Sequence, residues 1–81
     1  MSLPPTTAPQ LGAAIRTFRT SRKLTIEDLA GEADVHYTHV SSIERGKSNP
    51  GWEIVSKLAA ALEVSVGDLE RVGAEQAEAE S

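Results

Sequence analysis

Apolar residues recur along this chain at intervals of three and four, the spacing that places them on one face of a helix. The first such stripe, within residues 10–23, comprises Leu11, Ala14, Ile15 and Phe18. Further stretches with helical spacing cover residues 26–33, 36–45, 51–62 and 65–72. We therefore expect an all-α fold, a compact bundle of five short helices joined by short loops and without strands.

Polar residues mark where several of these helices begin and end. Capping boxes, in which a hydroxyl residue precedes an acidic residue by three positions, are predicted for Thr25 with Asp28 and for Ser65 with Asp68. Asp34 is expected in a left-handed conformation in the turn between the second and third helices. His36 is expected to cap the third helix, and Gly46 is expected to end it.

The length and the composition of the ends predict a single folded domain. With 81 residues the chain is long enough for one domain at most. Residues 1–9 contain three prolines and no helical pattern, so we expect a flexible N-terminal arm. Residues 73–81, GAEQAEAES, are acidic and lack an apolar stripe, so we expect a disordered tail. Residues 10–72 would then form the folded domain.

The composition argues against several classes of function. The chain has no cysteine and only two histidines, so we expect no disulfide, no metal site and no cofactor. No nucleophile–base spacing is recognisable and the chain is too short for a closed pocket, so we expect neither enzymatic activity nor a small-molecule ligand. No apolar run approaches the roughly 18–20 residues that span a membrane, so we expect a cytoplasmic protein without membrane contact.

The formal charge of −4 at pH 7 is unevenly distributed along the chain. Residues 1–50 carry six basic and five acidic residues, whereas residues 51–81 carry two and seven. The first half can therefore present basic groups to phosphates although the whole chain is acidic. The net charge does not exclude DNA as a partner.

The third predicted helix has an unusual outer face. Val40 and Ile43 share its inner side, whereas the other side carries hydrogen-bonding side chains without charge, namely Tyr37, Thr38, Ser41 and Ser42. A helix of this kind fits the major groove of double-stranded DNA with its N-terminal side chains toward base edges. Polar residues are also common on solvent-facing helices, so this face alone does not decide between DNA readout and an ordinary surface.

Several motifs resemble the helix-turn-helix family of the phage lambda repressor and Cro, the XRE-like regulators. The matching segments, between Leu11 and about Leu69, are LGAAIRTFR, LTIEDLA, VSSIERGKSNP and KLAAALEVSVGDL. Within this family the chain is most similar to small stand-alone regulators, such as the controller proteins of restriction–modification systems. The resemblance implies a lambda repressor-like DNA-binding domain.

The resemblance also implies how individual residues would meet DNA. Base-reading positions of the family correspond to Tyr37, Thr38 and Ser42, with His36 and Ser41 beside them. Phosphate contacts would come from the start of the second helix and the loop after the third, that is, from Thr25, Arg45, Lys47, Ser48 and Asn49. His39 would either contact a phosphate or be a half-packed surface residue.

Three further positions have expected roles other than base reading. Ile26 stands where many relatives have a glutamine that binds a phosphate, so that contact would be lost or moved to Thr25. Arg19 and Glu44 match a pair that the family uses as an internal salt bridge, so both would be structural. Trp52 is expected on the inner face of the fourth helix, as a core residue with its N–H at the surface rather than as a partner-binding residue.

Together these features predict a sequence-specific, DNA-binding transcriptional regulator that reads a pseudo-palindromic operator. Its third helix, about residues 37–45, would lie in the major groove, and the bound protein would be associated with the nucleoid. One module makes few base contacts, so we expect a homodimer with an interface formed by Val64, Val66, Leu69 and Val72. The alternative is a protein-interaction module, an antitoxin or adaptor, that uses the surface of the fourth and fifth helices and contacts DNA only secondarily.

Overall fold

The computed structural model describes the backbone of residues 7–80 and the side chains of residues 7–77. This part of the chain folds into α1 (Ala8–Ser21), α2 (Ile26–Ala33), α3 (Tyr37–Glu44), α4 (Trp52–Leu62) and α5 (Val66–Glu80). No strand occurs between residues 7 and 80. The expected all-α fold of five helices is confirmed.

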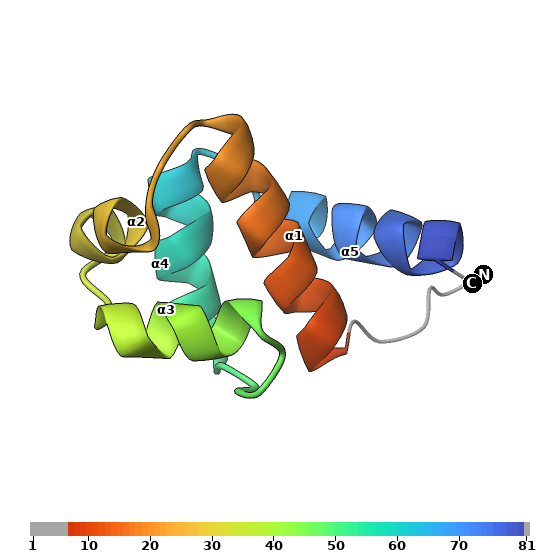
Figure 1. The fold of residues 1–81 in the computed structure, drawn as a ribbon, viewed down its shortest axis with the longest axis horizontal. Helices are drawn as coiled ribbons and strands as arrows, with labels where there is room; N and C mark the ends of the chain where they lie inside the picture. Colours follow the sequence, from red (N-terminus) through yellow and green to blue (C-terminus); the bar gives the residue numbers. More distant parts are fainter. Residues whose placement is uncertain (1–6, 81) are drawn as a thin grey trace.

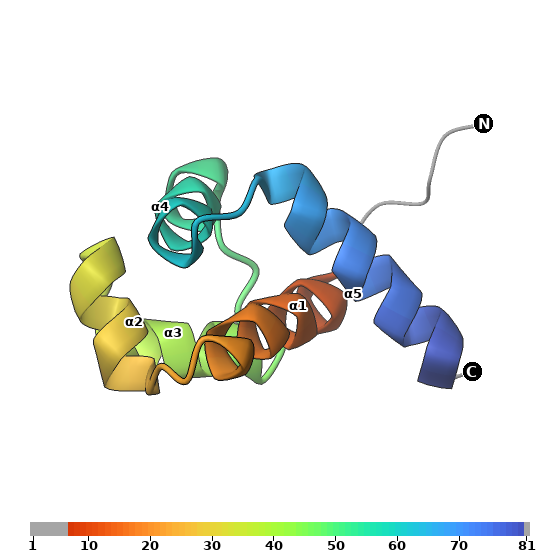
Figure 2. The same cartoon turned by 90° about the horizontal axis from the view of Figure 1, so that it is seen from above.

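Helix α1 is the central element of the fold. It packs against α3, α4 and α5, while α2 packs against α3 and α4. Figures 1 and 2 show α5 on one side of α1 and the α2–α3 pair on the other. In the view of Figure 2, α5 runs away from α2 and α3, so these two ends of the molecule present separate surfaces.

The core consists of aliphatic side chains drawn from all five helices. Its largest fully buried members are Ile15, Leu29, Val40, Ile43, Leu58, Leu62 and Leu69. They occupy the apolar positions of the helical stripes, so the periodicity of the sequence accounts for which face of each helix turns inward. No described residue with a polar or charged side chain is fully buried.

The helix ends follow the capping signals of the sequence. In the box that opens α2, the Asp28 N–H donates to Thr25 Oγ1 at 3.0 Å and the Thr25 N–H donates to Asp28 Oδ2 at 2.9 Å. Ser65 and Asp68 form the same box before α5, with distances of 2.9 and 3.0 Å. Asp34 adopts the expected left-handed conformation, with φ 56° and ψ 48°, and Gly46 has φ 73° after α3.

Two glycines allow α1 to approach its neighbours closely. A Cβ atom on Gly12 would lie 2.1 Å from the carbonyl oxygen of Ile43, at the end of α3. A Cβ atom on Gly73 would lie 2.7 Å from the carbonyl oxygen of Gln10, where α5 crosses α1. Since real Cβ atoms do not approach backbone this closely, the two crossings require glycine.

Both ends of the folded domain differ from the boundaries expected from sequence. Helix α1 begins at Ala8 rather than near Gln10, because Thr7 and Gln10 form a capping box and a proline is tolerated in the first turn. The first six residues of the expected arm lie outside the described part of the chain.

The expectation of a disordered tail from residue 73 onward is wrong for residues 73–80. Helix α5 continues without a break to Glu80, and Ser81 lies outside the described residues. Gly73 is buried against α1, and Gln76 Nε2 donates a hydrogen bond to Thr17 Oγ1. This segment docks through a glycine and polar contacts, which an apolar stripe does not reveal, and its alanines and glutamates favour helix.

The expectation that Trp52 fills the core is also wrong. Its side chain is 72% exposed at the first position of α4. Spacing places Trp52 on the same stripe as Val55 and Ala59, which are buried. However, periodicity gives a direction around the helix axis and does not say whether another element covers the first turn.

One of the four residues expected at a dimer interface lies inside the protomer instead. Leu69 has no exposed surface and belongs to the core, because the apolar side of α5 faces α1 and α4. The other three, Val64, Val66 and Val72, are half-buried and pack against the edge of that core. Only these three still have surface with which to meet a partner.

Candidate nucleic-acid interface

A tight turn fixes the angle between α2 and α3. The left-handed Asp34 ends α2, and the Val35 N–H donates to the carbonyl of Ala30 at 3.1 Å. Val35 is buried below the turn, and Val40 and Ile43 are buried on the inner side of α3. The opposite side of α3 therefore has to face outward.

The N-terminal turn of α3 gathers three of the predicted base-reading residues. His36, Tyr37 and Thr38 are all exposed. The rings of His36 and Tyr37 stack with centroids 5.3 Å apart and an angle of 25° between their planes. His36 caps the helix, since its Nδ1 accepts a hydrogen bond from the Thr38 N–H at 3.3 Å, and Thr38 Oγ1 lies 2.7 Å from the same Nδ1.

The next turn of α3 is linked to the loop that follows it. Ser42 Oγ and Ser48 Oγ lie 2.6 Å apart, so a predicted base-reading hydroxyl and a predicted phosphate-binding hydroxyl are hydrogen-bonded to each other. The Lys47 N–H donates to the carbonyl of Ser42 at 3.0 Å, which holds the loop against the helix end. Ser41 and Ser42 are half-buried, and both are less accessible than Thr38.

The predicted phosphate-binding residues flank this helix on two sides. Lys47 and Asn49 are exposed in the loop between α3 and α4. Arg45 is exposed and donates its Nε to the carbonyl of Ser41 at 3.4 Å. His39 is half-buried on α3. This position is compatible both with a phosphate contact and with an ordinary half-packed surface residue.

Thr25 and Ile26 lie at the start of α2, where the sequence has isoleucine in place of the glutamine of many relatives. Thr25 is exposed, and its Oγ1 accepts the Asp28 N–H within the capping box. Ile26 is half-buried and packs against the core. An apolar side chain packed against the core offers no hydrogen-bonding group for a phosphate, so of these two residues only Thr25 is polar.

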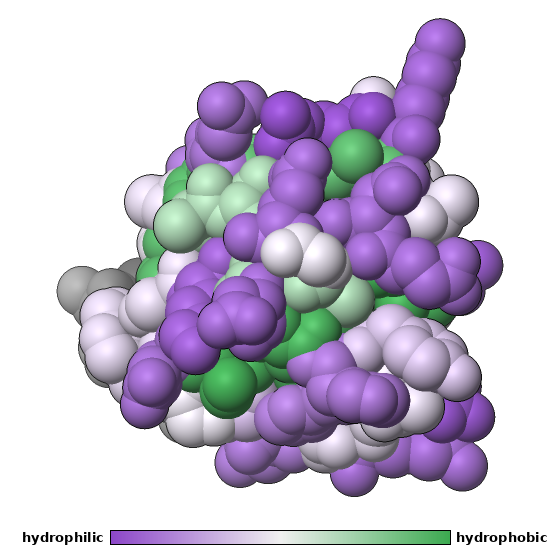
Figure 3. All heavy atoms as spheres, turned by 90° about the vertical axis from the view of Figure 1, so that its left-hand side faces the viewer, coloured by the Kyte–Doolittle hydropathy of each residue, from purple (hydrophilic) through white to green (hydrophobic). Residues whose placement is uncertain are grey.

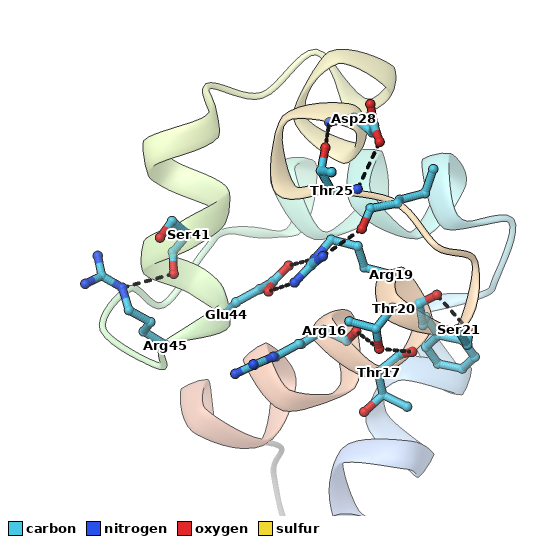
Figure 4. A network of polar contacts seen from close by, with 12 residues as sticks. Arg16, Thr17, Arg19, Thr20, Ser21, Thr25, Asp28, Ser41, Glu44 and Arg45 are labelled. Carbon is cyan, nitrogen blue, oxygen red and sulfur yellow. Dashed lines mark hydrogen bonds and ion pairs between the residues drawn. The ribbon is translucent and has the colours of Figure 1, made fainter.

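Arg19 and Glu44 form the pair that the family resemblance implies. Arg19 donates Nε and Nη2 to the two carboxylate oxygens at 2.7 and 2.9 Å, and donates Nη1 to the carbonyl of Leu24 at 2.7 Å (Figure 4). The side chains are only 12% and 5% exposed. Hydrogen bonding to Glu44 raises the pKa of Arg19 above its ordinary value, against the opposing effect of burial. Both groups are part of the scaffold that holds α3 against α1.

The basic residues divide into two groups by their partners. Four of the eight pair with carboxylates within the described side chains, namely Arg19, Arg22, Lys57 and Arg71. The other four have no carboxylate partner among residues 7–77, and these are Arg16, Lys23, Arg45 and Lys47. Two of them, Arg45 and Lys47, immediately follow α3.

Arg16 is an exposed basic residue for which the sequence predicted no role in DNA binding. It lies one helical turn after Gly12 and one before Arg19, the residues through which α1 meets the end of α3. In Figure 4 the side chains of Arg16 and Arg45 both extend toward the side on which α3 lies. The spacing of Gly12, Arg16 and Arg19 already places them on one face of α1. Only the crossing of the helices shows that this face lies against the end of α3.

The surface around α2, α3 and α4 is mainly hydrophilic. Figure 3 faces this end of the molecule and shows polar residues over most of it, with apolar atoms visible between them. The described residues contain no group of three metal-ligating side chains that could hold an ion. None of the described helices is long and apolar enough to cross a membrane. The surface offers hydrogen-bond donors, acceptors and cations. These groups suit a nucleic acid, whose phosphates are anionic and whose base edges form hydrogen bonds.

Comparisons with known proteins agree with this geometry. The control protein C.BamHI of Bacillus amyloliquefaciens is 39% identical over 59 residues, which cover 72% of this chain and 73% of that protein. The HTH-type transcriptional regulator DdrOP3 of Deinococcus deserti is 36% identical over 55 residues, 68% of this chain. The chain spans only 43% of the length of DdrOP3.

A solved structure and a family model extend the comparison. The crystal structure of the clp gene regulator ClgR from Corynebacterium glutamicum superposes with a TM-score of 0.83 at 32% identity, over 89% of this chain and 77% of that one. A family model described as helix-turn-helix, HTH_3, matches residues 15–69. The resemblance seen in the sequence motifs is confirmed, and the chain belongs to the HTH_3 helix-turn-helix family.

Proposed function

We propose that this protein is a sequence-specific DNA-binding transcriptional regulator that places α3 in the major groove of an operator. The observation that carries the proposal is the exposed polar turn at His36, Tyr37 and Thr38, held outward by a buried inner face and by the Arg19–Glu44 pair. Side chains at the N-terminal end of such a helix reach base edges. The HTH_3 match, and relatives named as transcriptional regulators, support the same function.

The phosphate backbone would be held on both sides of α3. The contacts would come from Thr25 at the start of α2 and from the loop residues Lys47, Ser48 and Asn49. Arg45 and His39 would add contacts on the α3 side. The unpaired cations support this assignment, since Arg45 and Lys47 have no described carboxylate to neutralise them. Such a protein would act in the cytoplasm, associated with the nucleoid when bound.

Useful specificity would come from two copies on a pseudo-palindromic site. The recognition helices of such dimers lie one turn of DNA apart, about 34 Å. The half-buried Val66 and Val72 belong to α5, and the half-buried Val64 lies just before it. Figure 2 shows α5 running away from α2 and α3. A dimer formed there would leave both reading faces free.

The function is tested by selecting binding sites from a pool of randomised duplexes, followed by anisotropy titration of an enriched duplex. We expect an inverted-repeat consensus and an affinity that falls log-linearly with salt concentration. Thr38→Ala should relax the sequence preference, whereas Lys47→Ala should weaken binding to all duplexes alike. Failure to enrich any sequence, even at low salt, would refute the proposal.

The exposed Trp52 is the one observation that favours the alternative, a protein-interaction module that uses α4. As the chain has a single tryptophan, its fluorescence separates the two functions. Trp52 follows the loop assigned to phosphate contacts, so DNA binding should shield it from an aqueous quencher. If enriched duplex leaves the quenching unchanged while Trp52→Ala abolishes binding of a purified partner protein, the interaction module is the better description.

A further inference from the structure

The hydrogen bonds around His36 fix the tautomer of its ring. The backbone N–H of Thr38 donates to His36 Nδ1 at 3.3 Å, as the cap of α3. A ring nitrogen that accepts a hydrogen bond carries no proton, so Nδ1 is unprotonated in this arrangement. The neutral ring therefore carries its proton on Nε2.

Thr38 is the donor in a second hydrogen bond to this ring. Thr38 Oγ1 lies 2.7 Å from the same Nδ1. Since Nδ1 has no proton to give, the threonine hydroxyl is the donor. Its only proton is then used within the protein, and Thr38 Oγ1 has nothing but lone pairs left for another molecule. His36 can only donate to another molecule, because its remaining polar group is the Nε2–H.

Both groups are accessible, and the ring is held in place. His36 and Thr38 are exposed, and the stacked Tyr37 ring restricts rotation of the imidazole. In the major groove adenine and cytosine present an exocyclic amine donor, whereas guanine and thymine present carbonyl acceptors. A threonine hydroxyl that is free to rotate can donate to the carbonyl of guanine or thymine, or accept from the amine of adenine or cytosine. A hydroxyl already committed as a donor can only accept.

We propose that the His36–Thr38 hydrogen bond makes Thr38 a reader of amino-bearing bases, selecting adenine or cytosine on the DNA strand that it faces. His36 would present only its Nε2–H, to a base acceptor or a phosphate oxygen. The inference rests on the proposed DNA-binding function and names the chemical class that one residue of the interface selects.

The tautomer is tested in the free protein. Long-range proton–nitrogen NMR spectra distinguish protonated from unprotonated ring nitrogens, and His39 in the same spectra serves as an internal comparison. We expect the Nε2–H tautomer for His36 at neutral pH. An Nδ1–H tautomer would overturn the inference, because Thr38 would then be free to donate.

The base preference is tested by repeating the selection from randomised duplexes with two variants. The wild-type chain should enrich adenine or cytosine at one position of the half-site, and Thr38→Val should lose that preference. His36→Gly keeps an acceptable N-cap but frees the hydroxyl, so guanine and thymine should be admitted there. Retention of the adenine or cytosine preference by His36→Gly with wild-type helicity contradicts the mechanism, as does a wild-type preference for guanine or thymine at the Thr38-sensitive position.

A base analogue provides a measurement that does not depend on the folding of His36→Gly. An enriched adenine, or the equivalent adenine-substituted site, is replaced by purine, which lacks only the amine. Wild-type affinity should fall several-fold, and Thr38→Val should show no further loss on the purine duplex. An unchanged wild-type affinity would overturn the inference. If the wild-type chain enriches no sequence at all, the proposed function fails, whereas the NMR spectrum still decides the tautomer.

Discussion

Gly12 shows how a single residue sets the distance between two elements. A Cβ atom there would lie 2.1 Å from the Ile43 carbonyl oxygen, and backbone cannot move aside as a flexible side chain would. We expect Gly12→Ala to lower the free energy of unfolding by about 1–3 kcal/mol or more, as overpacking does. Gly31 is the matched control, because nothing lies within 4 Å of its Cβ position in α2.

Gly31→Ala should raise the stability by about 0.5–1 kcal/mol, since alanine loses less backbone entropy in a helix. Urea unfolding followed by circular dichroism measures both changes. Equal stability of the two variants would show that the α1–α3 crossing adjusts to a methyl group, contrary to the geometry described.

The Arg19–Glu44 pair is a second place where two individual residues hold α1 against α3. Because both side chains are largely buried, Arg19→Met should cost roughly 3–5 kcal/mol of unfolding free energy by leaving the Glu44 carboxylate without its partner. Arg71→Met, which removes an exposed ion pair, should cost no more than about 1 kcal/mol.

The double variant Arg19→Met/Glu44→Leu should be destabilised by less than the sum of its single changes, since neither charge is then left unpaired. Denaturant midpoints of the four proteins in this cycle provide the measurement. Strict additivity would mean that the two groups do not interact in solution.

At the level of helices, the capping boxes of α2 and α5 give a pH dependence with a definite sign. Hydrogen bonds from the N–H groups and hydroxyls of Thr25 and Ser65 hold the pKa values of Asp28 and Asp68 below their ordinary value of 3.8. A carboxyl whose pKa is lowered by folding stabilises the fold above its unfolded pKa. That contribution is lost as the pH falls through the lower, folded value.

We therefore expect Asp28→Asn/Asp68→Asn to be less stable than the wild-type protein at pH 7, with a difference that shrinks as the pH falls below about 4. Thermal unfolding between pH 3 and pH 7 measures this difference. Glu70→Gln, an exposed change outside the boxes, serves as the control. A difference that grows on acidification would contradict the assignment of the caps.

Helix α1 also has an expected role beyond the core. Its exposed Arg16 lies on the face that crosses the end of α3, together with Gly12 and Arg19. If it contacts a phosphate, Arg16→Gln should weaken binding to all duplexes and reduce the slope of log affinity against log salt by about 0.9. Arg71→Gln, on α5 and already paired with Asp68, should leave the slope unchanged. Identical slopes for both variants would exclude a contact by Arg16.

For the whole molecule, the separation of surfaces makes a prediction about assembly. The proposed reading face lies on α3 and the proposed dimer surface near α5, which points away from it (Figure 2). Sedimentation should show a concentration-dependent dimer that Val72→Asp weakens and Glu70→Gln leaves intact. The Val72→Asp monomer should still bind a single half-site, but weakly. A chain that stays monomeric at all concentrations, on DNA as well, would contradict the two-fold operator.

Local features explain why much of the fold could be predicted from sequence. The helical spacing of Leu29, Val40 and Leu58 determines which faces turn inward, because each helix must bury its apolar stripe. The boxes at Thr25 and Ser65 also act within four residues. The outward position of Tyr37 and Thr38 follows from the same spacing, and the family resemblance gave their expected role.

The remaining features depend on contacts between residues distant in sequence, which spacing does not encode. Leu69 was expected at a dimer interface and Trp52 in the core, but the packing of α5 buries Leu69, and Trp52 is exposed at the start of α4. The extension of α5 to Glu80 depends on the close crossing at Gly73. The sequence by itself determined the helices, their inner faces and the polar side of α3. Only the tertiary structure decided which surfaces stay uncovered and, through the bond from Thr38 to His36, which hydrogen-bonding group that side presents.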